Sequence, residues 1–470
     1  MPASHRRPFR PFRPTLLALS LLAALALAGP PAAAELPRRA FLGLQVAPAP
    51  SAEAAVPEGA APAEAPPAGV VVAGVVAGSS AAAAGVPVGA RVVSVAGHAV
   101  ATPQEFVQVV GSLAAGDRLA LVLEVDGERI ERDVRLAPMP RESSAEWEVV
   151  YGEVEEGGKR FRTLLTHPRG EGPFPTVFMV QGLGCFSVDD PQGQGLWVDL
   201  LADLSRAGYA TVRVDKPGTG DSEGGPCRDV DFRRELAVYR AALTAAAGWS
   251  PVDPERLFLF GHSMGGIMAP LLAQPATAGE ASPLRGAVVY GTGFGSWTAY
   301  SLENLTRQGR MAGEDAAEIR RWQADEELLL ARLYVDDRPL EEILAETPRL
   351  GEAWPNPPYM YAGKHYRYFQ QVADLNLPQE WKTAGIPVLA AWGTSDFVAS
   401  GWEHEWLAEA ANAWRPGSGT YAPIPEADHW LRRAASFGAS AVQGPFGGEY
   451  HPGLAERMIA WMDGLAKPAR

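Results

Sequence analysis

The chain has 470 residues, 47% of them hydrophobic, and a formal net charge of −14 at pH 7. This length exceeds that of one ordinary domain, so we expect two or three globular units. The acidic balance disfavours nucleic acid and anionic membrane surfaces as partners, because both would repel the chain.

The first 34 residues have the three-part layout of a secretory signal peptide. The basic segment HRRPFRPFRPT precedes the apolar run LLALSLLAALALA, and the small residues Ala32 and Ala34 stand just before Glu35. The apolar run is too short to span a membrane, and removal of the segment is expected, with an uncleaved N-terminal anchor as the alternative. The sequence therefore predicts an exported protein, periplasmic or extracellular, without an integral membrane span after signal removal.

Residues 35–140 contain several predicted strands and one predicted helix. FLGLQV is followed by an Ala/Pro/Glu-rich stretch without periodicity, which we interpret as a flexible insertion over 47–68. The segments VVVAGVV and GSSAAAAGVPVGARVVSVAGHAV follow, and then a helix is predicted over 102–113. Apolar and polar residues alternate within LALVLEVDG and within ERIERDVRLA, on the two sides of Asp126-Gly127. Two alternating segments joined by Asp-Gly are a strong hairpin signal.

This order of elements resembles the PDZ domains attached to bacterial envelope proteases. FLGL resembles the carboxylate-binding loop of that family, and GSSAAAAGVPVGARVVSVAGHAV resembles its short helix, tight turn and strand pair. The resemblance implies that the backbone N–H groups of Leu42, Gly43 and Leu44 receive the C-terminal carboxylate of a peptide, which adds as a strand beside FLGLQV. Alternatively, Leu42 and Leu44 fill the module's own core, as do Phe106 and Val110 on the helix, and the module is a spacer or an intramolecular docking unit.

Residues 145–470 alternate between predicted strands and helices after the polar stretch PRESSAE. WEVVYGEV and RFRTLLTHP predict a hairpin, and six further strands are predicted at PTVFMVQ, YATVRVD, RLFLFGH, LRGAVVYG, IPVLAAWG and SGTYAPI. Helices are predicted over 197–207, 231–246, 402–413 and 453–466. This alternation predicts an α/β fold whose mostly parallel sheet is flanked by helices, with functional loops at the carboxyl ends of the strands. A helical, aromatic-rich insertion over about 295–383 is interpreted as a cap.

The segment FLFGHSMGGIMAP places Ser263 between a predicted strand and a predicted helix. A G-x-S-x-G pattern in this context forms a sharp turn that lifts the serine oxygen above the sheet, because the small flanking residues allow it. The alternative is a chance motif in a glycine-rich chain. The strand–turn–helix context favours Ser263 as a nucleophile.

A serine hydroxyl needs a base within hydrogen-bond reach, and the imidazole that serves as base needs a carboxylate to fix its tautomer. Asp396 follows the strand of LAAWGTS, and His429 follows the last predicted strand within EADHW. This gives the chain order serine, acid, histidine. The rival acids and bases, which we consider weaker by position, are Asp374, Glu405, Asp428, His262, His365, His404 and His451.

Acyl transfer also needs donors for a developing oxyanion. The backbone N–H of Met264, at the start of the helix after the nucleophile, is the first expected donor. The second is expected in the loop QGLGC after PTVFMVQ, at Leu183. In this loop, Gln181-Gly182 occupies the place of a His-Gly pair that is common in this type of site. The loop is therefore predicted to supply the second donor, but the choice of the Leu183 amide within it is less certain from the sequence.

From Trp147 to Leu465 the chain resembles an α/β-hydrolase, on the strength of QGLG, DKPGTGDSEG, GHSMGG, WGTSD and ADH. The resemblance implies a catalytic triad of Ser263, Asp396 and His429, and a chiefly structural role for DKPGTGDSEG. Cys185 ends the oxyanion loop and Cys227 ends the DKPGTGDSEG loop, and both loops leave neighbouring strands on the same face. In an exported protein the two cysteines are expected to form a disulfide, with two separate buried thiols as the alternative.

The triad and fold imply acyl transfer to water without fixing the leaving group. A carboxylic ester hydrolase is the favoured function, since cap aromatics could line an apolar acyl pocket or could equally form the cap's core. An aminopeptidase-like serine peptidase is the first alternative, with Glu303 as the carboxylate for a substrate amine. A non-catalytic envelope adaptor that binds peptide C-termini through the PDZ-like module is the second. The cap aromatics in question are Trp297, Tyr300, Trp322, Tyr359, Tyr361, Tyr366, Tyr368 and Phe369.

The sequence predicts neither a metal nor an organic cofactor. Its histidines and carboxylates lack ligand spacing, and its two cysteines do not make a zinc set. Neither a phosphate-binding P-loop nor a dinucleotide fingerprint is present. The expected partners are therefore a small acyl ester or peptide substrate and, at the PDZ-like module, peptide C-termini.

Overall fold

The computed structural model describes residues 35–49, 70–111, 113–275, 282–352, 354, 356–445 and 447–466. The predicted signal peptide lies outside the described residues, as does the predicted insertion from residue 50 onward. Ala47 and Pro48 belong to strand β2 instead. In the part of the chain that is described, no helix is long and apolar enough to cross a membrane.

The N-terminal part is β-rich, as predicted. A sheet has the strand order β2-β3-β4-β6-β7, with β5 paired to β4, and a separate two-stranded pair joins β1 to β8. The predicted hairpin is confirmed, because β6 and β7 pair antiparallel around Asp126-Gly127, both with positive φ. The elements are β1 (Ala40–Phe41), β2 (Leu44–Pro48), β3 (Val70–Val75), α1 (Ser80–Ala83), β4 (Arg91–Val95), β5 (His98–Ala99), α2 (Pro103–Gly111), β6 (Arg118–Val125), β7 (Glu128–Arg135) and β8 (Ala137–Pro138).

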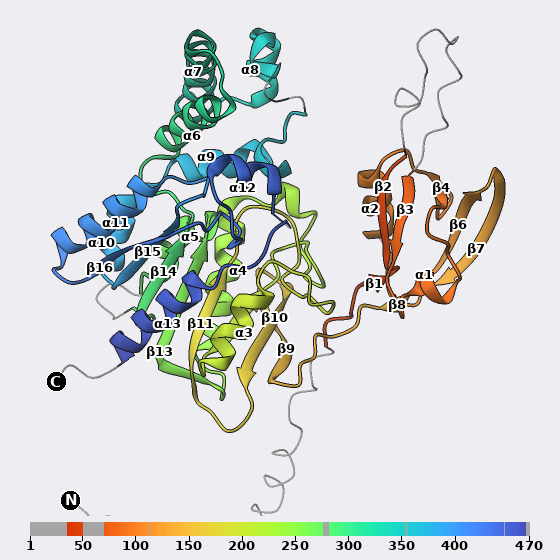
Figure 1. Ribbon diagram of the computed structural model, residues 1–470, viewed down its shortest axis with the longest axis horizontal. Helices are drawn as coiled ribbons and strands as arrows, with labels where there is room; N and C mark the ends of the chain where they lie inside the picture. The colour runs from red at the N-terminus through yellow and green to blue at the C-terminus, as the bar shows by residue number, and fades with distance from the viewer. Residues whose placement is uncertain are drawn as a thin grey trace, which may run out of the picture. The chain divides into compact units, whose positions relative to one another are not determined.

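The larger part of the chain is built on an eight-stranded sheet of order β16-β15-β14-β13-β11-β12-β10-β9 (Figure 1). The six strands β11 to β16 run parallel. The predicted hairpin β9–β10 pairs antiparallel with them through β10 and β12. The parallel strands are continuous apolar runs because helices cover both faces. The strands are β9 (Trp147–Glu156), β10 (Lys159–Pro168), β11 (Phe174–Val180), β12 (Ala210–Val214), β13 (Val252–His262), β14 (Gly286–Tyr290), β15 (Val388–Gly393) and β16 (Gly419–Ile424).

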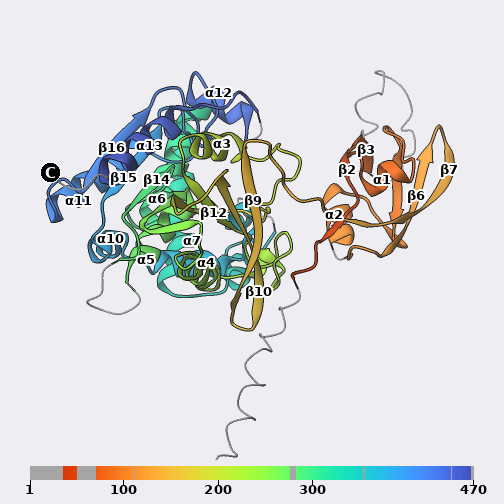
Figure 2. The same cartoon turned by 90° about the horizontal axis from the view of Figure 1, so that it is seen from below.

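Helices pack on both faces of this sheet, as Figure 2 shows, and give it two apolar layers. One face carries α3 (Val198–Arg206) and α13 (Gly453–Ala466). The other face carries α4, α5, α10 and α11. Their bounds are α4 (Phe232–Ala246), α5 (Met264–Ala273), α10 (Leu377–Ala384) and α11 (Gly401–Trp414). The α/β class and the mostly parallel, helix-flanked sheet predicted from the alternation of elements are confirmed.

The insertion between β14 and β15 is helical. Three of its helices, α6 (Trp297–Ala312), α7 (Ala316–Leu330) and α8 (Leu340–Glu346), stand together at one end of the molecule's larger part (Figure 1). A helix with π geometry, Ala331–Val335, continues α7. Helix α9 (Tyr366–Ala373) contacts α4 as well as α6 and the Ala331–Val335 helix, and α10 packs against α5. The end of the cap at about residue 383 stays a prediction.

Candidate active site

Ser263 lies at the sharp turn between β13 and α5. Its backbone has φ 53° and ψ −119°, a conformation that costs a non-glycine residue free energy and that tight packing must hold. A Cβ atom on Gly261 would lie 2.6 Å from the carbonyl oxygen of Gly265, and one on Gly265 would lie 2.1 Å from that of Val180. Neighbouring backbone atoms thus leave no room for a side chain at either glycine of the motif. The Ser263 side chain lines a cavity.

His429 and Asp396 are joined by a hydrogen bond of 2.8 Å between Nδ1 and Oδ2. Oδ1 of Asp396 accepts from the amides of Val398 and Ala399, each at 2.8 Å. Burial raises the pKa of the Asp396 carboxyl, but the imidazole and these amides outweigh it, so the net pKa lies below the ordinary value. The carboxylate is therefore ionised and orients the ring. A Cβ atom on Gly291 would lie 2.8 Å from His429 Nδ1, so a side chain there would displace the ring.

The rival side chains next to the pair have other partners. His262 is buried, which lowers its pKa to about 3, and its neutral ring hydrogen-bonds through Nε2 to the His429 carbonyl at 2.8 Å. Asp428 accepts from the amides of Trp430 and Arg432 through Oδ1. These two residues shape the turn that carries His429. The carboxylate on the His429 ring is that of Asp396.

Several of the predicted site residues line one cavity of about 1270 Å³. Ser263, Met264 and His429 line it, and so do Gly182 and Leu183 from the loop after β11. Of the cap aromatics, Trp297, Tyr300, Trp322 and Tyr361 line the cavity. Tyr366, Tyr368 and Phe369 are instead buried in the apolar core, as the alternative interpretation held.

The oxyanion loop is held by a buried lysine that the sequence analysis did not single out. Lys216 Nζ donates to the carbonyl oxygen of Gly182 at 2.6 Å. In a trans peptide unit the C=O and the following N–H point in opposite directions. Fixing the Gly182 carbonyl on Lys216 therefore also fixes the direction of the Leu183 N–H, which belongs to the same peptide unit.

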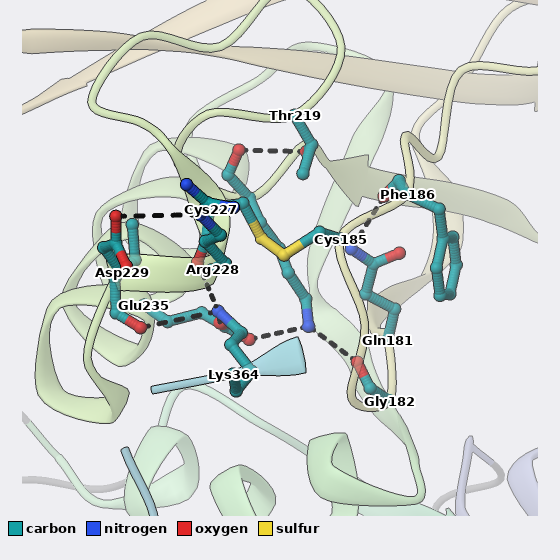
Figure 3. Close-up of a disulfide and its surroundings, with 12 residues drawn as sticks. Gln181, Gly182, Cys185, Phe186, Thr219, Cys227, Arg228, Asp229, Glu235 and Lys364 are labelled. Carbon is teal, nitrogen blue, oxygen red and sulfur yellow. Dashed lines mark hydrogen bonds and ion pairs between the residues drawn. A yellow bond between two sulfur atoms is a disulfide. The ribbon is translucent and has the colours of Figure 1, made fainter. Parts of the chain in front are cut away.

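Lys216 belongs to a buried network centred on Glu235. The Glu235 carboxylate lies 2.8 Å from Lys216 Nζ and 3.0 Å from Lys364 Nζ, and all three side chains are fully buried. Burial raises the pKa of Glu235, but the two ammonium groups outweigh it and the net pKa is lowered. Lys364 also donates to the carbonyl of Cys227 at 2.9 Å (Figure 3). Three segments distant in sequence thus meet behind the oxyanion loop.

Cys185 and Cys227 form a disulfide, which ties the oxyanion loop to the loop after β12 (Figure 3). Cys185 is exposed and Cys227 is buried, so a reductant can reach the bond from one side. The covalent link reinforces the same loop that Lys216 holds through Gly182.

Reduction of this disulfide is expected to lower the free energy of unfolding by about 4 kcal/mol, since the bond closes a loop with a sequence separation of 42. It is also expected to lower kcat, because the loop bearing Leu183 loses one restraint. Thermal unfolding and initial rates with and without dithiothreitol measure both effects. A Cys185→Ser/Cys227→Ser double variant is the control, whose rates should not respond to reductant. An unchanged kcat in folded, reduced protein would contradict the expectation.

Glu303 does not line the cavity; it pairs with Arg307 at 3.0 Å, one turn further along α6. The same face of α6 reaches the loop that carries Asp396. Tyr300 Oη, Asn304 Nδ2 and Arg307 Nη2 donate to the Val398 carbonyl at 3.1, 2.5 and 3.0 Å. The cap helix therefore supports the backbone whose amide holds the Asp396 carboxylate.

Of the three residues predicted to bind a peptide carboxylate, Leu42 and Gly43 lie just before β2 and Leu44 begins it. Strand β2 is at the edge of the N-terminal sheet. Leu42 is 3% exposed and packs in the core, and its carbonyl accepts from the Ala81 amide at 2.9 Å. Gly43 has φ 73°, and a Cβ atom there would lie 2.2 Å from Cβ of Ser79. Leu44 is partly buried against the same core. Peptide binding at these amides stays a prediction.

No group of three or more His, Cys, Asp or Glu side chains placed to hold a metal ion was found among the described residues.

Comparison with known proteins adds a family to this geometry. Residues 177–436 match the Alpha/beta hydrolase family, and the chain belongs to that family. It is 32% identical over 103 residues to the quorum-quenching protein AidA of Acinetobacter baumannii, covering 22% of this chain and 32% of that protein. It is 29% identical over 116 residues to the esterase EstD of Thermotoga maritima, covering 24% of this chain and 27% of that protein. The matches thus span about a third or less of these relatives.

Among solved structures, a thermostable carboxyl esterase from Bacillus coagulans aligns with 17% identity and a TM-score of 0.41, covering 68% of this chain and 99% of that one.

Proposed function

We propose that this protein is a carboxylic ester hydrolase that acts through an acyl-enzyme on Ser263. The observation that carries the proposal is the 2.8 Å bond from His429 Nδ1 to the ionised Asp396, because His429 lines the same cavity as Ser263. A charged carboxylate on Nδ1 leaves Nε2 as the basic nitrogen of the ring. Family membership and the partial similarity to an esterase support the same function.

In the proposed reaction, Ser263 Oγ attacks the acyl carbon and its proton passes to His429 Nε2. The N–H groups of Met264 and Leu183 donate to the oxyanion that develops on the carbonyl oxygen. The tetrahedral intermediate then breaks its bond to the alcohol oxygen, which takes the proton from the imidazolium and leaves. Water then attacks the acyl-serine and gives a proton to His429. The bond from the acyl carbon to Ser263 Oγ breaks, Oγ takes the proton from the imidazolium, and the carboxylic acid is released.

The peptidase alternative rested on Glu303, whose pairing with Arg307 outside the cavity wall favours the ester reading. We expect p-nitrophenyl acyl esters to be hydrolysed, and aminoacyl p-nitroanilides of matched acyl size to react far more slowly. Initial rates on the two series measure this. Efficient anilide cleavage that requires a free α-amine would contradict the proposal in favour of an aminopeptidase.

We also propose that the protein is exported and that its N-terminal sheet binds peptide C-termini. The disulfide supports the first, because such bonds persist in oxidising compartments. The edge position of β2 supports the second, since an edge strand can pair with an added peptide.

Cell fractionation tests whether the protein is exported. Comparison of a peptide with a free C-terminus against its amidated form tests carboxylate recognition.

A further inference from the structure

The cavity extends from Ser263 into the cap, where its wall contains a buried carboxylate. Glu326, on α7, lines the cavity and is 6% exposed. Its Oε1 accepts a hydrogen bond from Tyr361 Oη at 3.2 Å. Burial raises the pKa of Glu326, because it removes water from around the charged carboxylate. A cation placed beside it would restore the interaction energy that burial removes.

The tyrosine that donates to this carboxylate belongs to an aromatic cluster in the cavity wall. Tyr361 packs edge-on against Trp354, with ring centroids 4.6 Å apart, and against Trp297 at 6.3 Å. All three line the cavity. Tyr300 and Phe369 stack on the Trp297 ring, at centroid distances of 4.9 and 5.6 Å, so Trp354 and Tyr361 are the rings offered to a ligand. Faces of Trp and Tyr attract cations, most strongly when water is excluded.

The charges along the cavity point the same way. Six carboxylates and two guanidinium groups line it: Glu142, Asp189, Asp190, Glu314, Asp325 and Glu326, against Arg213 and Arg349. Arg213 is bound to Glu142, Arg349 to Asp325, and Asp189 to Arg38, which does not line the cavity. The carboxylates of Asp190, Glu314 and Glu326 remain in excess. A cavity of this sign raises the local concentration of cations and repels anions.

We propose that Glu326, Trp354 and Tyr361 form a subsite for the cationic end of the substrate, an alkylammonium group remote from the ester bond. The assignment of the ester end rests on the proposed function. Tyr300, which bonds to the Val398 carbonyl beside Asp396, stacks on Trp297 at 4.9 Å. Several side chains thus separate Glu326 from the catalytic pair. The substrate is accordingly an ester whose acyl chain carries the charge at its far end.

Binding to Ser263→Ala protein tests the subsite without any turnover. The probes are methyl esters of straight-chain acids from hexanoate to dodecanoate that end in a trimethylammonium group, each paired with its neutral tert-butyl isostere. Isothermal titration calorimetry is expected to show the cationic probe binding about tenfold more tightly than its isostere at one chain length. Adding Glu326→Gln, which keeps an oxygen for the Tyr361 hydrogen bond, is expected to abolish the preference.

Glu314→Gln is the matched control, because it removes an exposed carboxylate from the same cavity wall and leaves the aromatic cluster intact. It should retain the preference. Equal loss in the two variants, or no preference at any chain length, would overturn the subsite. If the enzyme with Ser263 intact hydrolyses neutral esters yet no preference is seen, only the subsite fails. If the cation is preferred but no ester is hydrolysed, the proposed function fails and the subsite stands.

Discussion

Ser263→Ala is expected to lower kcat/KM for p-nitrophenyl esters by at least about 10⁴-fold, because nucleophile and base act as a unit. The substitution removes one oxygen and keeps a Cβ, so the backbone at φ 53° is held by the same packing. Unfolding midpoints should therefore stay close to the parent value. Initial rates and thermal melts of the two proteins measure the two expectations.

Ser301→Ala is the matched control, since Ser301 also lines the cavity but donates to the Trp297 carbonyl within α6. Its rate is expected to remain near that of the parent. Equal rates in the parent and Ser263→Ala would refute the assignment of Ser263 as nucleophile.

Lys216→Met is expected to lower kcat by about 10²-fold with little change in KM. The methionine cannot donate to the Gly182 carbonyl, so the peptide unit that presents the Leu183 N–H loses its orientation, and one oxyanion donor is typically worth this much. Breaking a buried ion pair also costs about 3–5 kcal/mol of stability. Steady-state kinetics and denaturant melts separate the two effects.

Lys364→Met removes the other ammonium group from the same carboxylate and does not touch Gly182. It should destabilise the protein to a similar degree while keeping most of kcat. A similar fall of kcat in both folded variants would show that the network acts through general stability, and the positioning role of Lys216 would be wrong.

Much of the fold was readable from local patterns, for physical reasons. Apolar runs alternating with amphipathic segments predicted the sheet and its flanking helices, because each parallel strand is buried on both faces. The turn at Ser263 was readable because close backbone contacts demand glycine at particular positions. The chain order of Asp396 and His429 singled out the pair that the structure joins at 2.8 Å.

Other features had no local signal because packing between distant segments creates them. Glu235, Lys216 and Lys364 lie in three separate segments, and only folding shows that they share one buried network. The sequence does contain a signal against Glu303 as a site residue. Arg307 follows it by four residues, the spacing at which opposite charges pair along a helix. Glu326 sits mid-helix among charged neighbours, and nothing local distinguishes it.

The attachment of α6 to the Val398 carbonyl has a consequence for engineering this enzyme. Three side chains of the cap helix donate hydrogen bonds to the loop that contains Asp396. The cap therefore helps to position the carboxylate of the proposed triad. Replacing the cap to change which substrates enter would also alter the chemistry. Redesign of selectivity should therefore leave the Tyr300–Arg307 face of α6 in place and vary the helices beyond it.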